Sequence, residues 1–179
     1  MKKLSNLVAA ASVAVAILIG TNVKAQTTTT ADSPWRLGIG VEGGVPTGNV
    51  KNFSNFELGG TGRLQYDLTD KFDITLTSGY YSFLGKDIPG TSSKYTSLGV
   101  VPVKAGIKAF FAQDLYFGAE AGAGFETNGA NKSTKLILSP ALGWANQSWD
   151  VGVRYENFSG GNGPNYGTVA LRVAYGFKL

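Results

Sequence analysis

The stretch Trp35-Arg36-Leu37-Gly38-Ile39-Gly40-Val41-Glu42-Gly43-Gly44-Val45 decides the fold, because apolar and polar positions alternate along it. Its odd positions carry Trp35 and aliphatic side chains, apart from Gly43, and its even positions carry Arg36, Glu42 and glycines. Successive side chains of a β-strand point to opposite faces, so this segment has one apolar face and one charged face. Such a strand needs lipid or a core on one side and a polar environment on the other.

The same alternation returns along the rest of the chain. We predict eight strands, at residues 35–45, 56–67, 72–83, 98–111, 115–126, 135–144, 149–158 and 167–179. Their lengths, about ten to thirteen residues, are near what a tilted strand needs to cross a bilayer. The charged faces hold eight basic and eight acidic residues: Arg36, Arg63, Lys104, Lys108, Lys135, Arg154, Arg172 and Lys178 against Glu42, Glu57, Asp67, Asp73, Glu120, Glu126, Asp150 and Glu156.

The connections between these strands alternate in length. Long polar connections are predicted at 46–55, 84–97, 127–134 and 159–166, and short ones at 68–71, 112–114 and 145–148. Short turns on one side and longer loops on the other are typical of outer-membrane barrels, in which the short turns lie in the periplasm.

Aromatic residues gather at the predicted strand ends, where their rings would lie in the headgroup zone of a bilayer. We predict an aromatic girdle of Trp35, Tyr66, Phe72, Phe117, Trp144, Trp149, Tyr155 and Phe177. Phe158 is a further candidate for the rim on the long-loop side.

Alternating strands suit either a soluble barrel, with charges outside, or a membrane barrel, with charges inside. An Arg or Lys facing lipid at the midplane costs about 2–4 kcal/mol, and the two signs are balanced, so we place the charges inside. An open sheet cannot exist in lipid, and eight strands close around side chains rather than a wide pore. Pro102 and Pro140 each remove a ladder hydrogen bond, and we expect local bulges there.

We therefore expect a structural network of buried charges in the lumen. Its predicted members are Arg36, Glu42, Glu57, Arg63, Asp73, Lys104, Lys108, Glu120, Arg154, Glu156 and Arg172. Within it, the four glutamates should pair with Arg63, Arg154 and Arg172.

The first residues have the features of an export signal. Lys2 and Lys3 precede an apolar stretch at 7–19, and Val23-Lys24-Ala25 resembles an A-x-A cleavage site. We predict a signal peptide at 1–25, a flexible lead-in at 26–34 and the barrel at 35–179. The chain has 16 Lys and Arg against 12 Asp and Glu, and three of the bases lie in 1–25, which leaves 13 against 12 and no argument for a nucleic-acid partner.

The chain has neither histidine nor cysteine, which removes the usual catalytic triads, the commonest zinc ligands and any disulfide. The G-x-G-x-x-G pattern at 38–43 lies inside a predicted strand with no helix after it, so it is no dinucleotide site. We expect no enzymatic activity, cofactor or metal.

The export signal, the eight segments, the loop alternation and the closing Val173-Ala174-Tyr175-Gly176-Phe177-Lys178-Leu179 resemble the small outer-membrane β-barrel domain family, of the OmpA/OmpX type. The resemblance implies an all-β, eight-stranded antiparallel up-and-down barrel in the outer membrane of a Gram-negative bacterium, inserted by the barrel-insertion machinery. It implies no single shared activity.

The expected role is structural, adhesive or surface-interacting, with the interior plugged by paired charges. A narrow porin-like diffusion channel is the first alternative, and a soluble exported barrel that binds an apolar ligand is the second. The expected partners are the lipid bilayer and lipopolysaccharide, together with an extracellular ligand held by the long loops. We expect a monomer.

Overall fold

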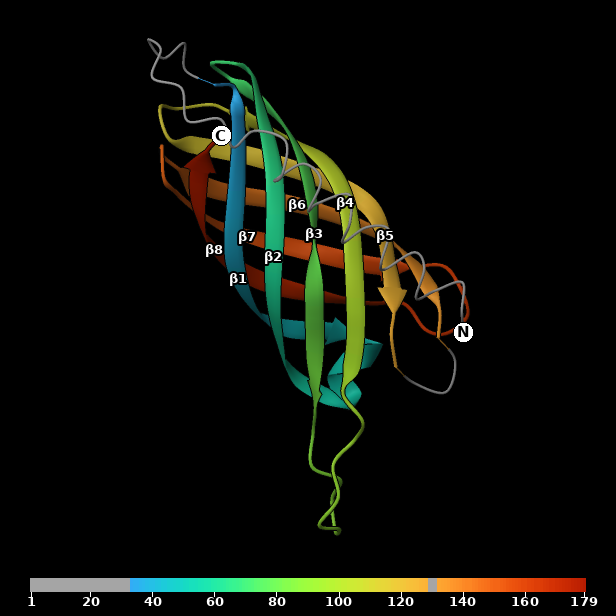
Figure 1. Cartoon of the computed structure of the whole chain (residues 1–179). Helices are drawn as coiled ribbons and strands as arrows, with labels where there is room; N and C mark the ends of the chain where they lie inside the picture. The colour runs from blue at the N-terminus through green and yellow to red at the C-terminus, as the bar shows by residue number, and fades with distance from the viewer. Residues whose placement is uncertain (1–32, 129–131) are drawn as a thin grey trace. The chain divides into compact units, whose positions relative to one another are not determined.

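The computed structural model describes residues 33–128 and 132–179, which form a closed barrel of eight antiparallel strands (Figure 1). Each strand pairs with its neighbours in sequence, and β1 pairs with β8 to close the sheet. The strands are β1 (Trp35–Gly48), β2 (Ser54–Thr69), β3 (Phe72–Gly85), β4 (Leu98–Phe110), β5 (Leu115–Glu126), β6 (Thr134–Ala145), β7 (Trp149–Ser159) and β8 (Tyr166–Lys178).

The predicted fold class is therefore confirmed, and the strand boundaries differ by a few residues. β1 continues to Gly48, and β2 begins at Ser54, so both reach further toward the loops than the alternation predicted. The short 3₁₀ helix η1 (Asn49–Asn52) connects them. The predicted signal peptide at 1–25 and nearly all of the lead-in at 26–34 lie outside the described residues.

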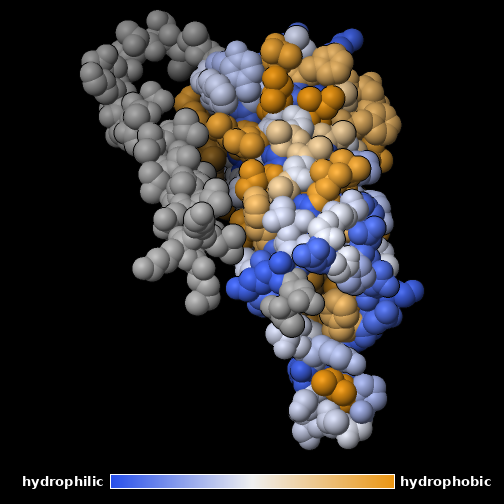
Figure 2. Space-filling view, turned by 90° about the vertical axis from the view of Figure 1, so that its right-hand side faces the viewer, coloured by the Kyte–Doolittle hydropathy of each residue, from blue (hydrophilic) through white to orange (hydrophobic). Residues whose placement is uncertain are grey.

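The barrel carries its apolar side chains outside and its charges inside, as a membrane barrel does. Ile74 and Val153 are 47% and 51% exposed on the outer surface, whereas Arg172 and Glu120 are buried in the lumen. Figure 2 shows a broad apolar band over the strands, with hydrophilic side chains gathered below it toward the β3–β4 hairpin. This arrangement is the reverse of a soluble barrel with an apolar ligand in its lumen. No helix among the described residues is long and apolar enough to cross a membrane.

The predicted aromatic girdle lies on the outer surface. Seven of its residues are clearly exposed, namely Trp35, Phe72, Phe117, Trp144, Trp149, Tyr155 and Phe177, and Tyr66 is half-buried. Trp35 stacks edge-on against Tyr66, with ring centroids 4.8 Å apart. The assignment of Phe158 to the rim was wrong, because its side chain points into the lumen and is fully buried.

The expected bulges at the two prolines are not observed. Pairing is interrupted beside Pro102 on its β3 side and beside Pro140 on its β7 side, but the register is the same before and after each gap. The hydroxyl of Ser78 donates to the Pro102 carbonyl oxygen at 2.9 Å, so the interrupted ladder keeps a cross-strand hydrogen bond. The register shifts of the sheet lie instead near the two ends of β2.

Several glycines leave room for the large side chains that fill the lumen. A Cβ on Gly40 would lie 3.2 Å from Cζ of Arg172, and one on Gly59 would lie 2.5 Å from Cδ1 of Tyr81. Real Cβ atoms do not come as close as 2.5 Å, and a 3.2 Å contact is tighter than nearly all of them, so a larger residue at either position would displace the side chains that fill the lumen.

Candidate functional site

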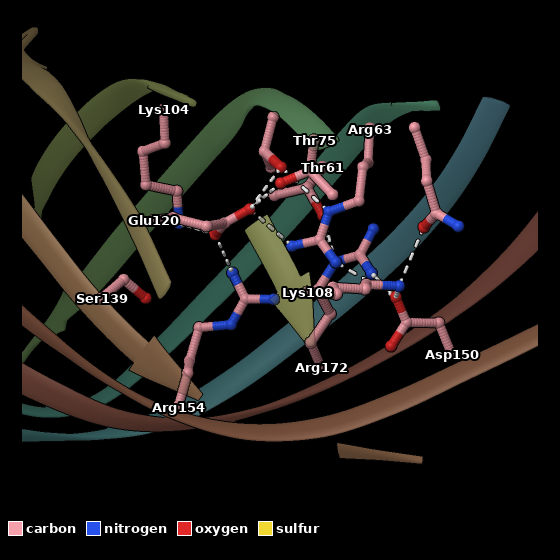
Figure 3. Close-up of polar contacts among 12 residues, drawn as sticks. Thr61, Arg63, Thr75, Lys104, Lys108, Glu120, Ser139, Asp150, Arg154 and Arg172 are labelled. Atoms are coloured by element: carbon pink, nitrogen blue, oxygen red, sulfur yellow. Dashed lines mark hydrogen bonds and ion pairs between the residues drawn. The ribbon is translucent and has the colours of Figure 1, made fainter. Parts of the chain in front are cut away.

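Glu120 on β5 is the centre of the charged cluster in the middle of the lumen. Its carboxylate lies 2.8 Å from Nη2 of Arg63, 3.3 Å from Nζ of Lys104 and 3.2 Å from Nη1 of Arg154. The Thr77 hydroxyl donates to it at 2.7 Å. These cations come from β2, β4 and β7, so one carboxylate connects strands on all sides of the barrel (Figure 3).

Asp150 on β7 is a second acceptor, nearer the short turns. It accepts hydrogen bonds from Arg63 at 3.1 Å, Lys108 at 2.8 Å and Arg172 at 3.2 Å, and from the Tyr116 hydroxyl at 2.6 Å. Arg63 bridges the two centres, because its other terminal nitrogen binds Glu120. Asp150 was predicted on the charged face but not in the network, since alternation reveals the face of a residue and not its partner.

Two further glutamates extend the cluster toward the long loops. Glu42 lies 3.3 Å from Arg154 and 3.5 Å from Arg172, and Glu156 forms ion pairs with Lys104 and Arg154. All five side chains are almost completely buried. Removing one partner of such a buried ion pair destabilises the folded protein by about 3–5 kcal/mol, because the remaining charge is then buried without compensation.

Three predicted members lie outside these pairings. Glu57 was expected to pair with an arginine, and this is wrong: it is fully buried, and neither carboxylate oxygen has a hydrogen-bond partner among the described residues. Arg36 lies at the short-turn rim, where it binds Asp67 at 3.1 Å. Asp73, also near that rim, makes no ion pair with any described residue, although it faces Lys108 across the β3–β4 ladder.

The long-loop end of the lumen is closed by an apolar cluster, the cap. Its buried members are Val50, Tyr81, Phe83, Val100, Ile137, Phe158 and Tyr166. The rings of Phe158 and Tyr166 stack with centroids 4.8 Å apart, and Phe83 meets Phe158 edge-on at 5.9 Å. Val50 comes from η1, so the β1–β2 connection folds over the lumen and contributes to its closure.

Lys135 holds the β7–β8 loop over the cap. Its buried ammonium donates to the backbone carbonyls of Gly160 at 2.8 Å, Gly163 at 3.1 Å and Pro164 at 3.2 Å. Gly160 and Gly163 adopt positive φ angles of 73° and 113°, which other residues rarely reach. The β7–β8 loop therefore wraps around the ammonium of Lys135, a residue that alternation predicted on the charged face of its strand.

The β3–β4 connection continues the barrel as a projecting hairpin (Figure 1). Asp87 and Lys94 pair across it, with a 3.5 Å ion pair, and the Tyr95 amide donates to the Lys86 carbonyl at 2.9 Å. The Lys86 amide in turn donates to the Phe53 carbonyl at 2.8 Å, which ties the base of the hairpin to the neighbouring connection.

Two features of the described residues bear on metal binding and catalysis. They contain no group of three or more potential metal ligands placed to hold an ion. The carboxylates of the central cluster are occupied by cations in a closed interior, and the chain has no histidine to act as a base. What the arrangement can do is close the lumen and present loops at one end.

No family model matches the chain, and no curated protein matches it either. Several solved structures do match the chain. Ail, the attachment invasion locus protein of Yersinia pestis, is 14% identical with a TM-score of 0.60, over 81% of this chain and 99% of that chain. The N-terminal barrel domain of Pseudomonas aeruginosa OprF is 15% identical with a TM-score of 0.56, over 79% of this chain and 97% of that chain.

Neisserial surface protein A is 16% identical with a TM-score of 0.53, over 82% of this chain and 98% of that chain. At these identities the likeness shows the fold alone. The expected resemblance to small eight-stranded outer-membrane barrels is thus confirmed at the level of the fold, and an apolar outer surface around a charged lumen agrees with it.

Proposed function

We propose that this chain is an integral outer-membrane barrel that acts at the cell surface through its long loops, in adhesion or another surface contact. The observation that carries the proposal is the closed lumen: charge pairs fill its middle and apolar side chains fill its loop end. This packing argues against a continuous water path through the barrel. The parts left to meet a partner are the projecting hairpin and its neighbouring loops.

The charge of these loops indicates the kind of partner. Four lysines lie on the described parts of the long loops, namely Lys51, Lys86, Lys94 and Lys132, against one exposed acid, Asp87. Lys86 also lies against the β1–β2 connection, because its ammonium donates to the Lys51 carbonyl. This cationic surface would attract polyanions such as sulfated or phosphorylated saccharides. Ail, which has the same fold, has been crystallised with the heparin analogue sucrose octasulfate.

Heparin affinity of the detergent-solubilised full chain tests this proposal. The triple variant Lys51→Gln, Lys86→Gln, Lys94→Gln should elute from immobilised heparin at clearly lower salt than the parent, since each lysine near a polyanion contributes to a salt-dependent affinity. Lys71→Gln, on a short turn at the opposite end, is the matched control and should elute with the parent. Equal elution of all three proteins would remove the polyanion as a partner, and unchanged cell adhesion after deletion of 87–94 would remove the hairpin.

A narrow diffusion channel is the second candidate, because the lumen is open to solvent at its short-turn end. Conductance measurements in planar bilayers distinguish a closed barrel from a channel. The closed lumen predicts no steady conductance in the parent. Conductance that changes in Arg63→Ala or Arg172→Ala would defeat the closed-barrel proposal.

A further inference from the structure

The lumen is not filled at its short-turn end. A cavity of about 760 Å³ opens there between the short turns, and we call it the vestibule. Asp150 with its bound cations lies on its wall, next to the closed middle of the barrel. This volume lies within the range of small-molecule pockets, about 300–1,000 Å³. In the proposed orientation, the vestibule faces the periplasm.

The cations around the vestibule are already committed to partners. Arg63, Lys108 and Arg172 all bind Asp150. Arg36 binds Asp67 and also donates to the Gln147 carbonyl at 3.0 Å. Within the described chain no cation remains free on this wall to bind an anionic guest.

Three carboxylates of the wall, in contrast, form no ion pair with the residues that the structure describes: Asp70, Asp73 and Asp114. Asp73 is the informative one, because it is only 5% exposed and still has no hydrogen-bond or ion-pair partner in the described chain. It lies directly opposite Asp67 in the β2–β3 ladder, with both side chains turned inward. Like charges in that position destabilise a sheet unless a cation offsets them.

The nearest candidate to offset Asp73 is engaged elsewhere. Lys108 is its direct partner in the β3–β4 ladder, but its ammonium donates to Gln65 at 2.9 Å and to Asp150 at 2.8 Å. The side chain of Asp73 thus lines an open cavity as an unpaired carboxylate, beside a second carboxylate that Arg36 already neutralises.

We propose that the vestibule binds a small organic cation with primary ammonium groups on a flexible chain, with Asp73 as its main anchor. Two observations favour an organic cation over a metal ion. The vestibule is many times larger than one ion, and no three potential ligands among the described residues lie close enough to hold a metal. Asp70 and Asp114, on the short turns at the mouth, would hold a second ammonium group of the same guest. This site is separate from the surface role proposed above.

Titration of the full chain in detergent micelles with cadaverine, followed by amide NMR shifts, tests the proposal. Cadaverine should shift the signals of vestibule residues in a saturable way. Asp73→Asn keeps the side-chain shape, removes the charge and should weaken the affinity at least about fivefold. Asp87→Asn, which removes an exposed carboxylate from the hairpin at the opposite end, should leave it unchanged.

Four outcomes would overturn the proposal. They are the absence of saturable shifts, equal affinity of the parent and Asp73→Asn, binding of the dianion glutarate at the same residues with similar affinity, and displacement of cadaverine by calcium at lower concentration. Heat-modifiable gel mobility reports whether each variant is folded. If Asp73→Asn does not fold, Asp114→Asn replaces it, and unchanged affinity in that variant also overturns the proposal.

Discussion

The middle of the lumen and its loop end are both closed, but by opposite kinds of side chain. In the middle, Glu120 and Asp150 each bind three cations that come from different strands. At the loop end, Phe158 and Tyr166 stack and Phe83 meets both rings edge-on, as in the core of a soluble protein. The two regions meet at Tyr81, whose ring belongs to the cap and whose hydroxyl donates to Glu156 at 3.3 Å.

The difference shows how each region should respond to substitution. A charge in the middle is stabilised by specific partners, so its loss leaves those partners uncompensated. A ring in the cap is stabilised by contact area, so its loss leaves a cavity whose cost depends on volume. In the charged middle, the loss of stability should therefore depend on which charged group is removed. In the cap, it should depend on how much side-chain volume is removed.

Glu120→Ala should have the largest effect. It would leave Arg63, Lys104 and Arg154 without their shared carboxylate, and we expect a loss of about 3–5 kcal/mol in the free energy of unfolding, measured by urea titration in lipid vesicles. A loss below about 1 kcal/mol would mean that the three cations find other partners, and the description of Glu120 as the centre of the cluster would be wrong.

Phe158→Ala should cost nearly as much, about 3 kcal/mol, because it leaves a cavity in the cap. Phe158→Leu retains most of the volume and should cost about 1.5 kcal/mol or less. The same urea titration measures both. Equal losses in the two variants would contradict a cap that depends on filled volume.

Lys135→Met should cost about 1–3 kcal/mol, since three backbone carbonyls of the β7–β8 loop lose a charged donor. We also expect faster proteolysis within 160–165. Lys94→Met, on the exposed hairpin, is the matched control and should change neither quantity. A cleavage rate equal to that of the parent would show that the loop does not depend on the buried ammonium.

Glu57→Gln should have the smallest effect, within about 1 kcal/mol of the parent or slightly stabilising. Glu57 has no hydrogen-bond partner among the described residues, and a neutral amide is less costly to bury than a carboxylate. Urea titration of Glu57→Gln and Glu120→Gln compares the same substitution at an unpaired and at a paired glutamate. If the two variants lose equal stability, the distinction between paired and unpaired glutamates fails.

Alternation in the sequence was enough to predict eight strands, their faces and the inward charges, because a one-residue slip would bring Arg63 or Lys104 into lipid. It could not predict which charges meet. The Glu120–Arg63 pair joins β5 to β2 across the lumen, and such contacts depend on the register and shear of the closed barrel. The pairing expected for Glu57 was wrong for the same reason.

The cap was missed although the sequence contained a signal for it. Phe83, Val100 and Phe158 share the parity of the charged residues on their own strands, a pattern that points their side chains inward although we did not predict it. We assigned Phe158 to the rim because aromatic residues at strand ends favour the headgroup zone. The bulges expected at Pro102 and Pro140 failed because the sheet omits local pairs there and keeps its register.

The β3–β4 hairpin has one further consequence, for immune recognition. Its backbone is fixed by the Asp87–Lys94 bridge and by the hydrogen bond between Lys86 and Phe53, which lies in another connection. An antibody raised against folded protein would meet a conformational epitope built from both connections. A linear peptide spanning 86–95 would lack the second of them and would compete poorly for that antibody.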